Sequence, residues 1–269
     1  MTFFPSRAIA LTIGPLSVHW YGVMYALAFL LAFWWLPRLT KYRQLELSGK
    51  DMEHFSLALI LGVLLGGRIG FVLFYGFEYF MTNPLEILAV WHGGMSSHGG
   101  FIGVMIALIL FAQKKRVSLL ALADIIVVPA AIGLALGRLG NFINGELYGT
   151  VTTLPWGMAF PEIEGLRHPT QLYAMAKDLF IALVCFLHLK RTAGSMKTRS
   201  GTTASIFLIL YGILRFIVEI FREQPYGYVS IAGLQLSWGQ VYTLPILVFG
   251  LALVIIVRRR GQNKRAEIV

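Results

Sequence analysis

The chain has 269 residues, of which 57% are hydrophobic and only 13% are charged, and its mean hydropathy is +0.71. Soluble domains usually carry about 45–50% apolar and about 25% charged residues, so this composition excludes an ordinary soluble protein. The formal net charge of +10 fits basic loops that face anionic lipid headgroups. Because no basic stripe is interleaved with aromatic residues, the charge does not indicate a nucleic-acid partner.

Seven stretches are long and apolar enough to cross a bilayer as helices, which takes about 20 residues each. We therefore expect an all-α polytopic membrane protein, with residues 1–269 forming a single membrane domain. Long strand-type alternation is missing from the sequence, which argues against a transmembrane β-barrel. The expected spans are 17–36, 54–76, 97–113, 118–136, 172–189, 203–221 and 236–257.

Basic residues gather in the loops after the first, third, fifth and seventh spans, whereas residues 78–100 contain neither Lys nor Arg. By the positive-inside rule, the N-terminus lies outside and the C-terminus lies in the cytoplasm. The first apolar stretch is long enough to remain as a span, and no convincing signal-peptide cleavage site follows it. Residues 138–170 then form the one sizeable extramembrane part, which we expect to be an outward-facing (periplasmic) head segment.

Residues 137–149 read GRLGNFINGELYG, which places polar side chains where an apolar helix meets a loop. Arg138, Asn141, Asn144 and Glu146 are all costly near hydrocarbon, and a cluster of such groups inside a membrane is a candidate functional site.

A second polar group lies along the sixth span. Tyr211, Arg215, Glu219 and Arg222 follow one another at intervals of four, four and three residues, so they share one helical face. Arginine at a helix centre costs about 2.5–3.5 kcal/mol on insertion scales, which favours a function for Arg215. Arg222 fits either a functional side chain or one that snorkels to the headgroups.

Two deeply placed arginines, Arg138 and Arg215, indicate an anion, because the guanidinium fork matches phosphate oxygens. At this depth the simplest phosphate is that of a phospholipid headgroup. His98 lies in the glycine-rich stretch 93–100 and is the candidate general base, with Tyr25 or Glu146 as alternative relays. Histidine, cysteine and carboxylate residues show no metal-ligand spacing, so we expect neither a metal nor a cofactor.

Other polar or small residues fit structural roles. Arg68 fits equally a binding role or a structural pairing. Gly62, Gly66 and Gly70 recur every four residues, which predicts close helix packing. The only cysteine, Cys185, is expected to pack in the inner half of the fifth span.

The candidate site residues lie in sequence motifs that resemble those of the prolipoprotein diacylglyceryl transferase family. The resemblance extends over essentially the whole chain. The motifs are HWYGVMY at 19–25, GGRIG at 66–70, HGG at 98–100, residues 137–149, RHPTQLY at 167–173, YGILRF at 211–216 and FREQP at 221–225. The family's important positions correspond to Tyr25, His98, Arg138, Asn141, Glu146, Gly149, Tyr211, Arg215 and Arg222. One departure is Ala174, where many members would carry a glutamate.

The resemblance implies a seven-helix enzyme of the bacterial cytoplasmic (inner) membrane. It implies transfer of the diacylglyceryl group of phosphatidylglycerol to the lipobox cysteine of a prolipoprotein signal peptide. A thioether would form and glycerol phosphate would leave. We assign the chemistry to His98, Arg138, Arg215, Tyr25 and Glu146. The residues expected to bind substrate are Arg138, Asn141, Gly149, Tyr211, Arg215, Arg222, Asn144 and Arg68.

The alternative is a transporter or scramblase that binds an anion or a lipid without chemistry. Such folds often contain internal repeats and broken helices at the membrane midplane. Here the sequence has no clear repeat, and its charged residues gather in one leaflet, which favours a one-sided enzyme.

Overall fold

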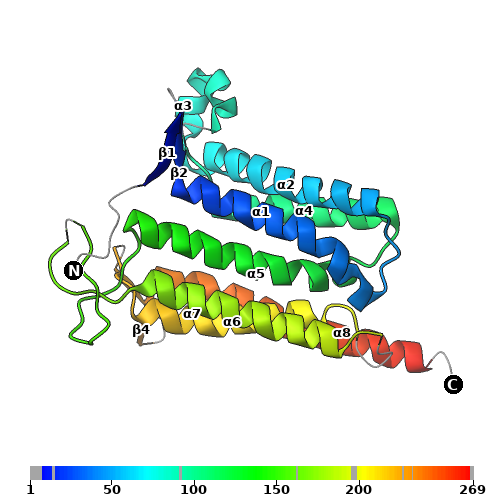
Figure 1. The fold of residues 1–269 in the computed structure, drawn as a ribbon. Coiled ribbons are helices and arrows are strands. Elements are labelled where there is room, and N and C mark those ends of the chain that lie inside the picture. Colours follow the sequence, from blue (N-terminus) through cyan, green and yellow to red (C-terminus); the bar gives the residue numbers. More distant parts are fainter. Residues whose placement is uncertain are drawn as a thin grey trace.

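The structure, a computed structural model, describes residues 8–13, 16–90, 93–161, 163–194, 199–225, 227–231 and 233–266. Within these ranges, seven helices are long and apolar enough to cross a membrane, which confirms the predicted all-α polytopic class. The helices run alongside one another as one bundle (Figure 1). They are α1 Trp20–Leu39, α2 Gly49–Tyr75, α4 Ser97–Lys115, α5 Leu119–Asn144, α6 Thr170–Arg191, α7 Thr202–Ile220 and α8 Trp238–Ala266.

The fourth spanning helix, α5, continues eight residues beyond its expected end at 136. Gly145 ends it in the left-handed conformation, with φ 73°, which glycine adopts at little cost. Arg138 and Asn141 consequently lie inside a regular helix rather than after it. The non-helical part of the predicted head segment begins at Gly145.

Helices α2 and α4 pack backbone to backbone through glycines, as predicted for Gly62, Gly66 and Gly70. A Cβ atom on Gly62 would lie 2.7 Å from the carbonyl oxygen of Gly103, and one on Gly70 would lie 2.7 Å from the Cα of Gly99. Such contacts leave no room for a side chain. The first turn of α4 is therefore held tightly against α2.

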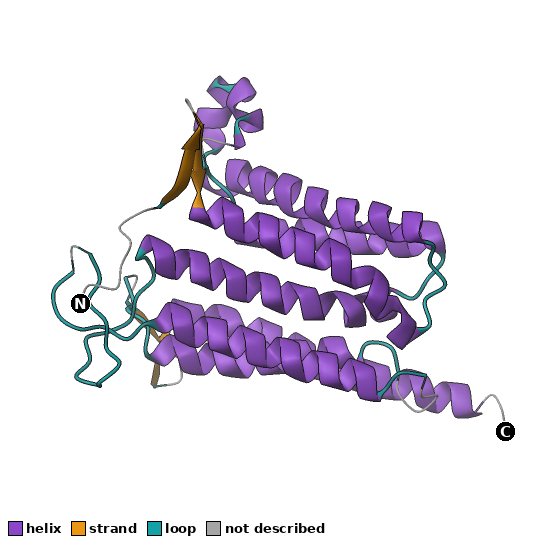
Figure 2. Cartoon of the chain, viewed as in Figure 1, coloured by secondary structure: helices purple, strands orange, loops and turns teal. Residues whose placement is uncertain are grey.

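Short elements gather at the end of the bundle where α1 begins, which we call the outer end, following the predicted orientation (Figure 2). They are the hairpin of β1 Ile9–Ile13 and β2 Leu16–His19, helix α3 Phe77–Thr82, the 3₁₀ helix Pro84–Leu88, and the hairpin of β3 Tyr228–Ile231 and β4 Leu234–Ser237. The sequence prediction missed these elements, and its first span, which began at residue 17, started inside the strand β2.

The opposite, inner end is fixed by a buried ion pair. The Nε of Arg43, from the 3₁₀ helix Thr40–Arg43, donates to Oδ2 of Asp124 at 2.7 Å. Asp124 is fully buried and also accepts from the backbone N–H groups of Gly201 at 2.9 Å and Ala204 at 2.8 Å. The start of α7 is thus capped by a side chain of α5, because a carboxylate satisfies the free N–H groups of a helix N-terminus.

Candidate active site

Three mutually packed helices, α5, α6 and α7, each carry a cation in the outer half of the bundle. Arg138 lies on α5 and is half-buried. Its charge acts on Tyr25 of α1, on Lys177 of α6 and on Arg222. Arg138 makes neither a hydrogen bond nor an ion pair with any residue that the structure describes. Its guanidinium is therefore available to an anion.

Arg215 and Arg222 share one carboxylate, that of Glu219. Nη1 of Arg215 lies 2.7 Å from Oε2 of Glu219, and Nη1 of Arg222 lies 3.7 Å from the same oxygen. Glu219 is buried, and Nε2 of Gln224 donates to its other carboxylate oxygen at 3.3 Å. Burial lowers the pKa of the Arg222 guanidinium, and the nearby charge of Glu219 opposes that shift. Glu219 thus fixes the positions of both guanidinium groups.

The start of α8 closes this arrangement from the far side. A Cβ atom on Gly239 would collide with the carboxylate of Glu219. A larger residue here would displace the Glu219 carboxylate from its position between the two arginines. The sequence prediction noted Glu219 as one turn from Arg215 but did not assign it to the site, although the spacing of four residues indicated the pairing.

The turn after α5 folds the carboxylate of Glu146 back onto two amides. Nδ2 of Asn141 donates to Oε1 of Glu146 at 2.7 Å, and Nδ2 of Asn144 donates to the same oxygen at 3.4 Å. Nε2 of Gln171, at the start of α6, donates to the Glu146 carbonyl at 2.7 Å. Oδ1 of Asn144 is buried and meets no hydrogen-bond partner among the described residues. Glu146 therefore orients both amides.

Gly149 joins the head segment to the end of α7. Its N–H donates to the His168 carbonyl at 2.9 Å, and its backbone forms a β-bridge with Arg222. A Cβ atom here would lie 2.5 Å from the Phe221 carbonyl oxygen and 2.6 Å from the Cβ of His168. The position therefore needs glycine for steric reasons.

Arg167 strengthens the same junction, and the sequence prediction gave it no role. Its Nη1 lies 2.9 Å from Oε2 of Glu223, and its guanidinium lies 5.5 Å from the ring centroid of Tyr148. Motif RHPTQLY was the only signal that could have drawn attention to it.

Two tyrosines line the neighbourhood of the arginines. On α1, Tyr25 packs edge-on against Tyr21 with ring centroids 5.0 Å apart. A Cβ atom on Gly140 would meet the Tyr21 ring at 2.9 Å, so close contact between α1 and α5 brings Tyr25 towards Arg138. On α7, Tyr211 lies one turn from Arg215, with its ring 4.1 Å from Nζ of Lys177.

Lys177 and Asp178 are both buried on α6 and form an ion pair with each other. The charges of Arg138 and Arg215 act on both residues. Ala174 is also buried, one turn before Asp178 on the same helical face. A carboxylate is therefore present one turn deeper than the position where the resemblance led us to expect one.

Two predicted site residues lie elsewhere. His98 is exposed in the first turn of α4, and no contact among the described residues joins it to the arginines. Arg68 is buried, and its guanidinium donates to five backbone carbonyls between residues 86 and 94. All five of its donors are thereby used, so Arg68 holds the connection between α3 and α4.

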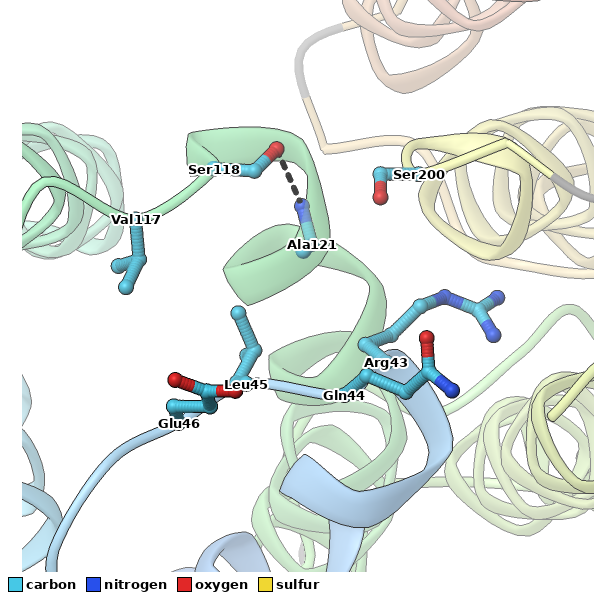
Figure 3. A pocket seen from close by; sticks show the side chains of 8 residues that line it. All are labelled: Arg43, Gln44, Leu45, Glu46, Val117, Ser118, Ala121 and Ser200. Atoms are coloured by element: carbon cyan, nitrogen blue, oxygen red, sulfur yellow. Dashed lines mark hydrogen bonds between the residues drawn. The ribbon is translucent and has the colours of Figure 1, made fainter. Parts of the chain in front are cut away.

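A cavity of about 330 Å³ lies at the opposite, inner end (Figure 3). The guanidinium of Arg43 at its wall is already engaged by Asp124, Thr192 and Thr203. Among the described residues that line the cavity, no free cation is left to recognise an anion. The cavity is lined by Arg43, Gln44, Leu45, Glu46, Val117, Ser118, Ala121 and Ser200.

The geometry can be set beside known proteins. A sequence model of the prolipoprotein diacylglyceryl transferase family matches residues 8–256. The chain belongs to this family. A similar protein from Polynucleobacter asymbioticus is 43% identical over 91% of this chain and 93% of its own length. A relative from Cupriavidus metallidurans is 42% identical over 96% of this chain and 96% of its own length. One from Geobacter sulfurreducens is 42% identical over 92% of this chain and 94% of its own length. All three bear the name phosphatidylglycerol–prolipoprotein diacylglyceryl transferase.

Proposed function

We propose that the chain transfers the diacylglyceryl group of phosphatidylglycerol to the thiol of a lipobox cysteine in a prolipoprotein signal peptide. It is a transferase of its family, and its relatives' names include both substrates. The observation that carries the proposal is the group of cations in the outer halves of α5, α6 and α7. Because the described charges of this group lie towards one end of the bundle, a one-sided reaction fits better than transport or scrambling.

The reaction is a substitution at the carbon of the diacylglyceryl group that carries the phosphate ester. The thiolate sulfur attacks this carbon, the C–S bond forms and the C–O bond breaks. The phosphate takes the electron pair and leaves as glycerol phosphate. Arg138 and Arg215 would stabilise the charge on the departing phosphate, since preorganised donors act strongly in a low-dielectric site. Asn141 and Asn144, oriented by Glu146, would supply amide groups to the headgroup.

A base must accept the thiol proton, and a free cysteine with a pKa of about 8.5 needs only modest help. His98, Tyr25 and Glu146 remain the candidates. The charge of Arg138 acts on Tyr25, whereas His98 lies on the α2–α4 pair and would serve only a thiol held between that pair and the arginines. A tenfold or greater loss of turnover in His98→Gln, with Tyr25→Phe retaining more, would identify His98.

The setting of the site is part of the proposal. The protein would lie in the bacterial cytoplasmic membrane with its N-terminus outside and its C-terminus in the cytoplasm. The head segment predicted at residues 138–170 would then lie on the periplasmic side, with residues 138–144 forming the outer end of α5. Phospholipids of the outer leaflet would reach the site there. Tyr211 and Arg222 would complete the lipid-binding wall, and Gly149 would hold the head segment against it. Arg68 would act by shaping the connection between α3 and α4.

Purified protein in phosphatidylglycerol vesicles with a fluorescent lipobox peptide tests this function. Mass spectrometry of the peptide should show the gain of one diacylglyceryl group, and glycerol phosphate should appear in equal amount. A peptide of unchanged mass, with lipid merely moved between leaflets, would instead support the transport alternative.

A further inference from the structure

Lys177 is a buried cation that neither the sequence motifs nor the family resemblance assigned to the site. It lies seven residues into α6, Arg138 lies six residues before the end of α5, and Arg215 lies five residues before the end of α7. At about 1.5 Å per residue, all three lie roughly 8–11 Å below the outer ends of their helices. Three packed helices thus each carry a cation at a similar distance from their outer ends.

The ammonium of Lys177 lies against α7, the helix that carries Arg215. Its Nζ lies 4.1 Å from the ring centroid of Tyr211, and Tyr211 precedes Arg215 by one turn on the same face of α7. The charges of Arg138 and Arg215 both act on Lys177. An ammonium group has three donors, and Asp178 is its only described hydrogen-bond partner. Donors therefore remain for an anion.

The ion pair with Asp178 does not by itself explain this lysine. Neighbouring residues in a helix do not face each other, so both side chains must bend to meet. Removing two charges from water is costly, and two nearby arginines repel the ammonium. Arg138, Lys177, Arg215 and Arg222 lie in or next to the outer halves of these helices, where the carboxylates that described site residues contact are those of Asp178, Glu219 and Glu146. The remaining excess of positive charge favours a negatively charged phosphodiester.

We propose that Lys177 is a further substrate-binding residue, whose ammonium donates to a phosphate oxygen of phosphatidylglycerol beside Arg138 and Arg215. Asp178 holds the ammonium in place until the phosphate arrives. This inference rests on the proposed transferase function. Lys177 makes no bond to the reacting carbon, so its loss should weaken lipid binding more than the chemical step.

The test measures KM for phosphatidylglycerol, KM for the lipobox peptide, kcat and inhibition by added glycerol 1-phosphate. For Lys177→Met we expect KM for the lipid to rise at least about tenfold, since one charge-assisted hydrogen bond is lost. Inhibition by glycerol 1-phosphate should weaken by a similar factor, and KM for the peptide should stay unchanged. Lys177→Arg should retain most of the lipid affinity. Lys114→Met, at the inner end of α4, is the control.

The double variant Lys177→Met/Asp178→Asn guards against a carboxylate left buried and unpaired. We expect it to bind lipid as poorly as Lys177→Met. Two results would contradict the proposal. The double variant could restore the lipid KM of the unaltered protein, or Lys177→Met could leave lipid KM and product inhibition within about twofold of the unaltered protein. In either case Lys177 is only one member of a structural ion pair. An inactive unaltered protein would instead refute the proposed function itself, so the two failures are distinguishable.

Discussion

Arg138 and Arg215 differ in what surrounds them. Arg215 is held by Glu219 at 2.7 Å, whereas the described residues offer Arg138 no ion-pair partner. An arginine already fixed by a carboxylate is preorganised, and an unpaired one can close onto its ligand. We propose that both contribute to catalysis through the fork geometry of guanidinium, which lysine cannot reproduce.

We expect Arg138→Lys and Arg215→Lys each to lower kcat/KM by about 100-fold or more, the effect of losing one preorganised donor to a developing charge. The transfer assay with a fluorescent peptide measures this. Arg191→Lys, an exposed position at the inner end of α6, should be unchanged. Activity within threefold of normal in both site variants would contradict the role of the fork.

We propose that Glu146 acts through the two amides that it orients, Asn141 and Asn144, which donate to it at 2.7 and 3.4 Å. Glu146→Gln keeps an acceptor oxygen, so at least about a tenth of the activity should remain. Glu146→Ala removes the acceptor and should lose about 100-fold, as expected for misplaced substrate-positioning groups. Complete inactivity of the glutamine variant in the same assay would show that Glu146 transfers a proton.

Sequence reasoning at the residue scale found Arg138 and Arg215 because charges in apolar segments are conspicuous. It could not settle the role of Arg68, since the backbone carbonyls that surround its guanidinium come from a short 3₁₀ helix and the loop after it, which the sequence prediction missed. It assigned no role to Lys177 and Asp178, two adjacent charges near the start of the fifth span. Only the packing of α6 against α7 shows that both are buried.

At the scale of elements, the glycines of α2 and α4 are spaced so that the backbones touch. Gly62→Ala should destabilise the protein by about 1–3 kcal/mol, the usual cost of overpacking, because its Cβ would lie 2.7 Å from a backbone oxygen. Thermal unfolding in detergent measures the loss. Gly49→Ala in the same helix has open space around it and should be neutral or slightly stabilising. Equal melting temperatures for the two variants would contradict the close packing.

Hydropathy located all seven spanning helices but not their ends. The α5 helix runs on to Asn144 because helical hydrogen bonding tolerates polar side chains, whereas a hydropathy window does not extend over them. The two hairpins were missed because their strands have only four or five residues. Strands so short, next to apolar spans, carry no clear alternation.

At the scale of the molecule, the two ends of the bundle have different tasks. The inner end holds the fully buried Asp124, and breaking a buried ion pair usually costs about 3–5 kcal/mol. Asp124→Asn should therefore lower stability by roughly this amount, as measured by chemical or thermal unfolding. The KM for lipid of the folded fraction should stay unchanged. Glu46→Gln, an exposed carboxylate at the same end, should have little effect. A raised lipid KM in Asp124→Asn would link the inner end to the site.

The predicted orientation can be tested by labelling introduced cysteines. The chain's single native cysteine, Cys185, is fully buried and should give little background labelling. A membrane-impermeant maleimide should label Glu164→Cys in spheroplasts. It should label Lys114→Cys only after the membrane is broken, because the latter lies at the end of α4 that the positive-inside rule places in the cytoplasm. The reverse pattern would invert the topology.

The most direct test of the central claim, that phosphatidylglycerol binds at the outer ends of α5, α6 and α7, is photocrosslinking. A phosphatidylglycerol analogue with a photoreactive group on its glycerol headgroup would be irradiated with the protein in vesicles, and the modified peptides identified by mass spectrometry. The account predicts crosslinks around Arg138, Asn144 and Arg215 that excess phosphatidylglycerol suppresses. Suppressible crosslinks at the inner cavity beside Arg43, with none at the arginines, would contradict it.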